Sequence, residues 1–194
     1  MKVVLASGNA GKVREFMQLL SSVGMDVRPQ SEFDVPDADE TGLTFVENAI
    51  LKARNAAKIT GLPAIADDSG IEVDALQGQP GIYSARYAGI GAGAAACNEK
   101  LLKALEGVPE AKRTARFRCC IVMMQHADDP SPIIAEGAWE GRILEQLTGS
   151  EGFGYDPLFF VPTHNMAAAE MDSAEKNKIS HRGQALNALL ERLS

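Results

Sequence analysis

The residues best suited to do chemistry are two adjacent aspartates, Asp67 and Asp68, which follow the apolar run 63–66 and precede Ser69 and Gly70. The run is typical of a buried strand, which we expect to end where the aspartates begin. Successive strand side chains point to opposite faces, so the two carboxylates should not act as one pair. Ligands of open α/β sheets bind beyond the carboxyl ends of strands, where a carboxylate could bind Mg²⁺ or orient a water. A plain Asp-Ser-Gly turn is the commoner meaning of such a motif.

A second candidate is the loop Ser7-Gly8-Asn9-Ala10-Gly11-Lys12, between an apolar strand at 2–6 and a helical pattern. Glycines let the backbone approach a ligand, and the amides of a helix N-terminus attract anions. Val13 follows Lys12 where a Walker A loop has Ser or Thr, and the spacing is too short for that motif. The loop therefore fits a phosphate site and a plain turn about equally well.

Two further loops carry suitable side chains. The acidic segment 37–42 contains Glu40, which could bind Mg²⁺, although such segments are usually solvated. The segment Gly152-Phe153-Gly154-Tyr155-Asp156-Pro157 frames aromatic side chains with glycines. An exposed ring there could stack on a base, or it could plug the core instead.

A basic group lies near the end of the chain, where Lys176 precedes Ser180-His181-Arg182-Gly183. Lys, His and Arg donors suit an oxo group or a phosphate. Basic side chains are unfavourable at a helix N-terminus, so this pair calls for an anionic or acceptor partner. The alternative is an ordinary basic helix start.

The clearest positioning element is a helix that begins after Thr44 and ends at Gly61. Thr44 and Glu47 have the spacing of a capping box, and glycine is a common helix terminator. Spacings of four and three place a polar stripe on one face of this helix: Asn48, Lys52 and Asn55.

The remaining pattern predicts an α/β fold with a mixed central sheet and flanking helices, within one domain over 1–194. An early strand–helix–strand order is followed by strands expected to pair antiparallel. Beyond the first strand and helix, we expect strands at 26–29, 71–74, 114–125, 132–142 and 158–161, and helices at 98–106, from 173 and over 181–193.

Composition excludes several classes of protein. The 194 residues include 26 acidic and 19 basic side chains, for a net charge of −7, which argues against binding nucleic acid by bulk charge. No stretch approaches the roughly 20 apolar residues of a membrane span, and the N-terminal apolar run is too short for a signal peptide. Three cysteines without metal spacing indicate reduced thiols, as in a cytoplasmic protein.

Taken in order, the motifs resemble those of the inosine/xanthosine triphosphate pyrophosphatases, in the form found in bacteria. Each motif alone is weak, but the ordered set is specific and spans nearly the whole chain. The motifs are Ser7-Gly8-Asn9-x-x-Lys12, Glu40-Thr41-Gly42, Phe45-x-Glu47-Asn48-Ala49, Lys52-Ala53, Ala66-Asp67-Asp68-Ser69-Gly70, Pro80-Gly81-Ile82-Tyr83-Ser84-Ala85-Arg86-Tyr87, Gly152-Phe153-Gly154-Tyr155-Asp156-Pro157 and Glu175-Lys176-x-x-x-Ser180-His181-Arg182-Gly183.

The resemblance implies Mg²⁺-dependent hydrolysis of ITP, dITP and XTP to the monophosphate and pyrophosphate, by a cytoplasmic homodimer with no nucleic-acid or membrane partner. It also implies that the fold has two lobes around a nucleotide-binding cleft. It assigns the triphosphate to residues 7–12 and Lys52, the metal to Glu40 and Asp68, and activation of water to Asp68. Ser69 would touch the substrate. The base would contact Phe153, which stacks, together with Gly154, Tyr155, Asp156, Lys176, His181 and Arg182.

One stretch departs from the family pattern. Residues 88–97 are rich in Ala and Gly where the family often has polar and acidic residues, so we expect a loosely ordered loop. Two other functions stay open: a pyrophosphatase for pyrimidine or modified nucleotides, and a nucleotide-binding sensor without turnover.

Overall fold

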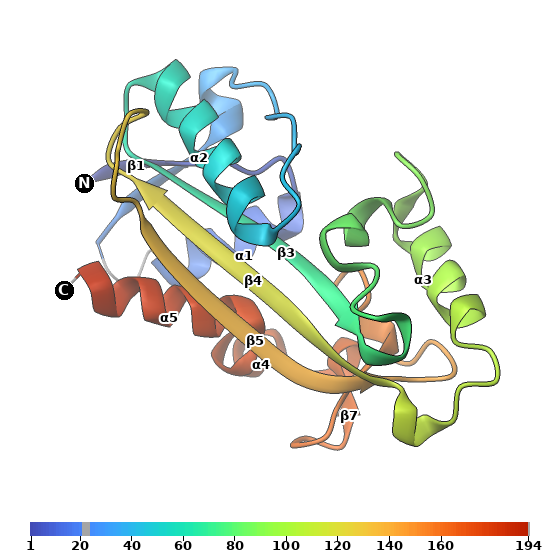
Figure 1. Ribbon diagram of the computed structural model, residues 1–194. Coiled ribbons are helices and arrows are strands. Elements are labelled where there is room, and N and C mark those ends of the chain that lie inside the picture. The colour runs from blue at the N-terminus through green and yellow to red at the C-terminus, as the bar shows by residue number, and fades with distance from the viewer. Residues whose placement is uncertain (21–23, 194) are drawn as a thin grey trace. The chain divides into compact units, whose positions relative to one another are not determined.

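The computed structural model describes residues 1–20 and 24–193. In this part of the chain, seven strands form one sheet in the order β2-β1-β3-β4-β5-β6-β7 (Figure 1). β1 pairs in parallel with β2 and β3, whereas β6 pairs antiparallel with β5 and β7, so the predicted mixed sheet is confirmed. The strands are β1 (Lys2–Leu5), β2 (Asp26–Pro29), β3 (Ala64–Val73), β4 (Thr114–Met124), β5 (Ile133–Ile143), β6 (Phe159–Val161) and β7 (Met166–Ala167).

Five α-helices and several short 3₁₀ turns lie among the described residues. The predicted helix at 98–106 begins earlier, within the Ala/Gly-rich stretch, because alanine is the strongest helix former. No described helix combines the length and apolarity that a membrane span requires. The helices are α1 (Ala10–Leu20), α2 (Phe45–Thr60), α3 (Gly93–Ala104), α4 (Ser173–Ile179) and α5 (His181–Leu193).

The described chain divides into two compact units. The first takes its residues from 1–68, 119–137 and 182–193, and the second from 69–118 and 138–181. β3, β4 and β5 contribute residues to both.

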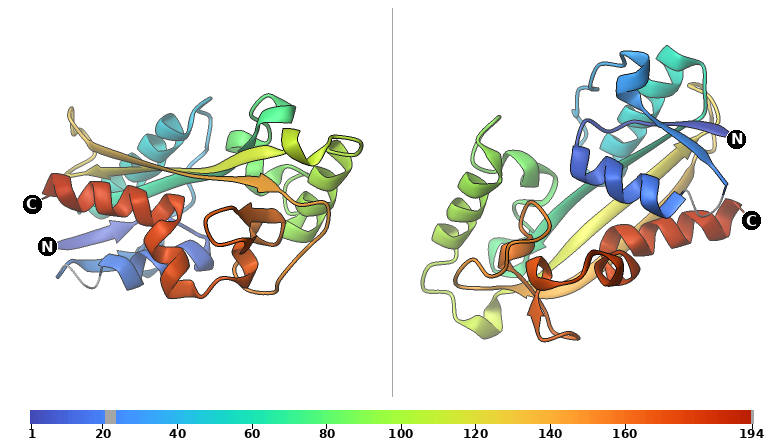
Figure 2. Two further views of the ribbon diagram at one scale, coloured as in Figure 1. Left: turned by 90° about the horizontal axis from the view of Figure 1, so that it is seen from below. Right: turned by 180° about the vertical axis from the view of Figure 1, so that it is seen from behind.

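In the first unit, alternate residues of β1 face different helices. Val3 and Leu5 pack in a cluster with residues of α1 and α5, whereas Val4 and Ala6 pack with the alanines of α2. Figure 2 shows α1 and α5 on the same face of this part of the sheet. Because β1 is buried on both faces, its sequence is an unbroken apolar run.

β3 corrects one prediction. The strand does not end at Ala66 but continues through both aspartates to Val73, so the expected separate strand at 71–74 is part of β3. Asp67 and Asp68 are 1% and 5% exposed. Strand residues can carry two buried carboxylates only where cations compensate them, and each aspartate has lysine partners, described below.

α2 forms as predicted. The Thr44 hydroxyl accepts the Glu47 amide hydrogen at 3.3 Å, and the Glu47 carboxylate accepts the Leu43 amide hydrogen at 2.9 Å. The helix ends at Gly61, whose positive φ of 67° suits glycine and whose amide bonds back to the Ala57 carbonyl. These ends fix the register of the polar stripe.

Candidate active site

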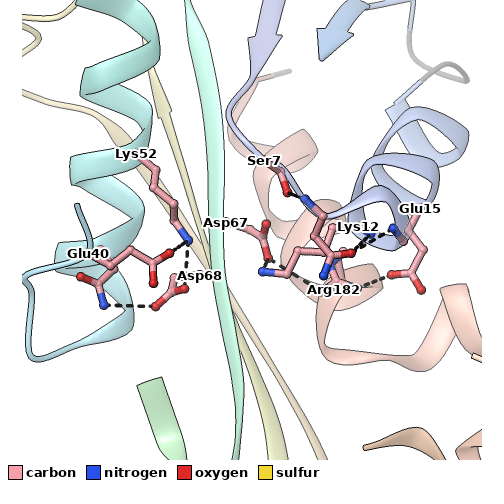
Figure 3. Close-up of polar contacts among 11 residues, drawn as sticks. Ser7, Lys12, Glu15, Glu40, Lys52, Asp67, Asp68 and Arg182 are labelled. Atoms are coloured by element: carbon pink, nitrogen blue, oxygen red, sulfur yellow. Dashed lines mark hydrogen bonds and ion pairs between the residues drawn. The ribbon is translucent and has the colours of Figure 1, made fainter. Parts of the chain in front are cut away.

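On the Asp68 face of β3, the carboxylates of Glu40 and Asp68 both contact the ammonium group of Lys52 (Figure 3). Lys52 Nζ lies 2.8 Å from Glu40 Oε1 and 3.0 Å from Asp68 Oδ1. One helical turn before Lys52, the side-chain nitrogen Nδ2 of Asn48 donates to Asp68 Oδ2 at 3.4 Å. The stripe on α2 therefore meets the carboxylate that the sequence singled out.

The same stripe holds the segment that carries Glu40. Asn48 Oδ1 accepts the Gly42 amide hydrogen at 2.8 Å, and Asn55 Nδ2 donates to the Pro36 carbonyl at 2.9 Å. A Cβ on Gly42 would lie only 2.5 Å from the Glu47 Cβ, so this close approach requires glycine. Glu40 thus reaches Lys52 from a segment fastened at both ends.

Burial and charge act in opposite directions on this face. Burial is the largest influence on the pKa of the Asp68 carboxyl and raises it, as does Glu40. Lys52 and Lys12 lower this pKa, and the net pKa lies above the ordinary value. For Lys52, burial alone would lower the pKa, but Asp67, Asp68 and Glu40 together raise it. Asp68 is therefore a carboxylate with some affinity for a proton, next to a permanent cation.

The Asp67 face is closed by ion pairs of a different kind. Lys12 Nζ lies 2.8 Å from Asp67 Oδ2, and the Arg182 guanidinium lies 3.8 Å from the same oxygen. Arg182 also pairs with the Glu15 carboxylate. Figure 3 shows the two aspartates pointing to opposite sides of β3, as alternation predicts.

These cations hold Asp67 ionised. Burial alone would raise the pKa of its carboxyl, but Lys12, Arg182 and Lys52 outweigh burial and hold it well below the usual range. The pKa of Arg182 is raised: burial lowers it, but Asp67, Cys119 and Glu15 together outweigh that effect. Asp67 is a fixed charge rather than a proton acceptor.

The glycine loop caps α1 with its own asparagine. Asn9 Oδ1 accepts the amide hydrogens of Gly11 and Lys12 at 2.9 and 3.1 Å. The backbone N–H of Asn9 donates to the Ser7 hydroxyl oxygen at 3.3 Å. Two of the amides expected to attract an anion are therefore engaged. The exposed amides of Gly8 and Ala10 have no partner among the described residues, so they are the ones suited to a phosphate.

In the second unit, the loop 152–156 closes on one carboxylate. Asp156 Oδ2 accepts the Phe153 amide hydrogen at 2.9 Å and lies 2.7 Å from Lys176 Nζ. The Lys176 ammonium lies 5.1 Å from the Phe153 ring centroid, within cation–π range. Tyr155 is 5% exposed, and its hydroxyl donates to the Ser84 carbonyl at 2.7 Å. Phe153 and Lys176 are thus brought together, whereas the Tyr155 hydroxyl is used inside the fold.

His181 and Arg182 are adjacent but belong to different environments. The His181 ring stacks on Phe117, with centroids 4.8 Å apart and planes at 12°, in an aromatic cluster that includes Trp139 and Phe159. Arg182 enters the ion pairs around Asp67. The anionic partners expected for this basic helix start thus include two protein carboxylates, Glu15 and Asp67.

Sequence reasoning missed two residues in these networks. Glu15 follows Lys12 by three positions on α1, a spacing that places both on one helix face and could have found it. Asn98, on α3, donates from Nδ2 to the Gly154 carbonyl at 2.9 Å, and no motif signalled it.

Ser69, which the resemblance assigns to the substrate, is half-buried and lies next to Asp68 on β3.

Known proteins resemble this chain over its whole length. Residues 3–192 match the Ham1 family. The dITP/XTP pyrophosphatase of Thioalkalivibrio sulfidiphilus is 67% identical over 193 residues, covering 100% of this chain and 98% of that protein. The protein of the same name from Vibrio parahaemolyticus is 62% identical, covering 100% and 96%. The structure of a HAM1 protein from Coxiella burnetii matches with a TM-score of 0.92 at 52% identity, covering 100% and 98%.

These likenesses confirm the resemblance drawn from the motifs and the α/β fold that it implied. Matches of this identity and coverage leave one conclusion: the chain belongs to the Ham1 family.

Proposed function

We propose that the chain is a nucleoside triphosphate pyrophosphatase that hydrolyses the non-standard purine nucleotides dITP, XTP and ITP to the monophosphate and pyrophosphate. The names of relatives at 62–67% identity support the substrate class. The observation that carries the proposal is the Asp68 carboxylate, set beside Lys52, Asn48 and Glu40 on one face of β3.

Asp68 is the proposed base. A water oxygen attacks the α-phosphorus, Asp68 takes the proton that this water loses, and the bond from the α-phosphorus to the bridging oxygen breaks, so that pyrophosphate leaves. Burial raises the pKa of Asp68, which makes it a better base than an ordinary aspartate, whose pKa is about 3.9. Positioning and charge compensation supply most of the catalysis in phosphoryl transfer, and we extend this to the present reaction.

The first unit also supplies the proposed triphosphate contacts. Lys12 and Lys52 compensate the charge of the phosphates and of the departing pyrophosphate. The exposed amides of Gly8 and Ala10 donate to phosphate oxygens, because they lie at the N-terminus of α1. Asp67 orients Lys12 through their 2.8 Å ion pair.

The donors around Asp68 fit Mg²⁺. Glu40 Oε1 and Asp68 Oδ1 both lie within 3.0 Å of one cationic atom, Lys52 Nζ, so two carboxylate oxygens already converge on positive charge. Mg²⁺ commonly takes one or two carboxylates together with substrate phosphates. When bound there, the ion would neutralise phosphate charge and acidify water. Among the described residues no group of three acidic, histidine or cysteine side chains forms a fuller cage.

The second unit supplies the proposed base contacts. Phe153 stacks on the purine, and Lys176 and His181 provide donors for its 6-oxo group. Adenine has a 6-amino donor at this position and would leave such groups unpaired, which can discriminate by roughly 10⁴-fold. The nucleotide-binding cleft, a homodimeric state and a cytoplasmic location belong to the same proposal.

The test is a substrate panel. ITP, dITP, XTP, GTP, dTTP and UTP are supplied with and without Mg²⁺, and pyrophosphate and orthophosphate are measured separately. We expect pyrophosphate from the first three in the presence of Mg²⁺. Release of orthophosphate would refute the assigned bond cleavage. Preference for dTTP or UTP would favour the pyrimidine alternative, and tight ITP binding without product would favour a sensor.

A further inference from the structure

The loop 152–156 is fastened to the rest of the second unit at several points. Lys176 reaches the loop through the Asp156 carboxylate, and the Tyr155 hydroxyl reaches the Ser84 carbonyl at 2.7 Å. The third contact is the 2.9 Å hydrogen bond from Asn98 Nδ2 to the Gly154 carbonyl. Of the three, this one joins a side chain from outside the loop to the backbone beside Phe153.

Gly154 is the point where the loop backbone most needs to be fixed. Its φ is +62° and that of Gly152 is +78°, so glycines on both sides of Phe153 have left-handed conformations. Glycine has many accessible conformations, so ordering it costs more entropy than ordering other residues. A hydrogen bond to the Gly154 carbonyl therefore limits how far the Phe153 ring can move.

Asn98 comes from a well-anchored helix. Cys97, Leu101 and Leu105 follow one another at spacings of four and are 3%, 0% and 0% exposed in the core of the second unit. They fix the face of α3 that carries Asn98. The Ala/Gly-rich stretch 88–97 supplies the first residues of this helix, from Gly93 onward, without a side-chain cap. This departure from the family pattern is therefore part of the support for the loop.

Only the donor of the Asn98 amide is used. Asn98 is 5% exposed, and its buried Oδ1 has no hydrogen-bond partner among the described residues. A buried acceptor without a partner costs stability. An apolar side chain of the same shape would avoid that cost, so stability alone does not explain an asparagine here.

We propose that Asn98 is a positioning residue that fixes the Phe153 loop through the Gly154 carbonyl, in the conformation that receives the purine base. The inference rests on the proposed function and deepens it. The base lies far from the bond that breaks, so its contacts should act equally on the ground state and the transition state. Loss of the hydrogen bond should therefore raise KM and leave kcat unchanged.

The test compares Asn98→Leu and Asn98→Asp with Leu102→Ala, a control that weakens the packing of the same helix. Leu102 is partly buried against the core, and its apolar side chain cannot form a hydrogen bond with the loop. Both Asn98 variants remove the donor, and aspartate also sets a carboxylate against the Gly154 carbonyl. Emission of Trp139, which is the only tryptophan, checks that the core of this unit is intact.

We expect Asn98→Leu to raise KM for ITP about 5- to 10-fold, the value of one hydrogen bond, with unchanged kcat and unchanged urea midpoint. The inhibition constant of inorganic triphosphate, which lacks a base, should not change. Asn98→Asp should raise KM further. Amide hydrogen exchange at residues 152–155 should accelerate in both variants and not in Leu102→Ala.

Two results would overturn the inference. In the first, Asn98→Leu leaves both KM and the amide hydrogen exchange at residues 152–155 unchanged. In the second, Asn98→Leu lowers kcat at constant KM, in proportion to the loss of folded protein. If the wild-type chain does not hydrolyse ITP, the proposed function fails. The exchange measurement still decides whether Asn98 fixes the loop, so the two failures are distinguishable.

Discussion

The two faces of β3 use the same residue type for different purposes. Lys12 lies 2.8 Å and Arg182 3.8 Å from Asp67, and these two cations together with Lys52 hold Asp67 ionised. Asp67 is thus a fixed negative charge that keeps Lys12 and Arg182 in place. Asp68, one residue on, shares Lys52 with Glu40, and burial raises its pKa. The difference between a positioning carboxylate and a reactive one therefore comes from the number of nearby cations and carboxylates, not from the residue type.

The largest expected effect is on the reactive face. Asp68→Asn keeps the size of the side chain but removes the base, so we expect kcat for ITP to fall by about 10²- to 10⁴-fold. Because the raised pKa shows that the fold disfavours ionised Asp68, the free energy of unfolding at neutral pH should stay the same or increase. Steady-state kinetics and urea denaturation measure the two effects. Near-normal kcat would refute the assigned role.

On the other face, the main effect should be on stability. Asp67→Asn leaves Lys12 and the buried Arg182 guanidinium with less compensation, which should lower the free energy of unfolding by about 3–5 kcal/mol. The loss in kcat of the folded fraction should be smaller than in Asp68→Asn. If Asp67→Asn and Asp68→Asn lowered kcat and the free energy of unfolding in the same proportion, the two faces would not have different roles.

The same variant has a defined pH dependence. The folded-state pKa of Asp67 is depressed, so its contribution to stability is present above the unfolded pKa of about 3.9 and is lost as pH falls toward the folded pKa. The stability difference between wild type and Asp67→Asn should therefore be largest above about pH 4 and should narrow below it. Urea titrations at several pH values measure this difference. A constant difference would show that Asp67 does not act through its charge.

The sequence allowed more of this site to be predicted than of its surroundings. Alternation along a strand separated Asp67 from Asp68, and helical spacing placed Asn48 and Lys52 on one face, because both arguments use only local geometry. The length of β3 was not predictable, since the aspartates tolerate burial only because Lys12 and Lys52 arrive from other elements. Asn98 was missed for the same reason: its partner is a backbone carbonyl 56 residues away. Every residue has such a carbonyl, so the sequence does not indicate which one accepts a hydrogen bond.

A smaller effect concerns the cation of the reactive face. Lys52 is the strongest of the groups that lower the pKa of Asp68, so Lys52→Met should raise that pKa and move the acid limb of the kcat/KM profile to higher pH. Lys12→Met is the matched control, because Lys12 pairs with Asp67 and acts on Asp68 less strongly. A shift as large in Lys12→Met would mean that the two faces are not electrostatically distinct.

The smallest expected effect has the opposite sign and isolates the second carboxylate. Glu40 raises the pKa of Asp68, less strongly than Lys52 lowers it, so Glu40→Gln should lower that pKa and move the acid limb to lower pH by less than Lys52→Met moves it upward. Glu40 is also a proposed metal ligand, so activity alone would mix the two roles. A ¹³C NMR titration of the Asp68 carboxyl without Mg²⁺ separates them, because it detects the charge of Glu40 directly. A pKa that rises in Glu40→Gln would mean that Glu40 holds Lys52 in position beside Asp68, and that the cation matters more than the repulsion between the carboxylates.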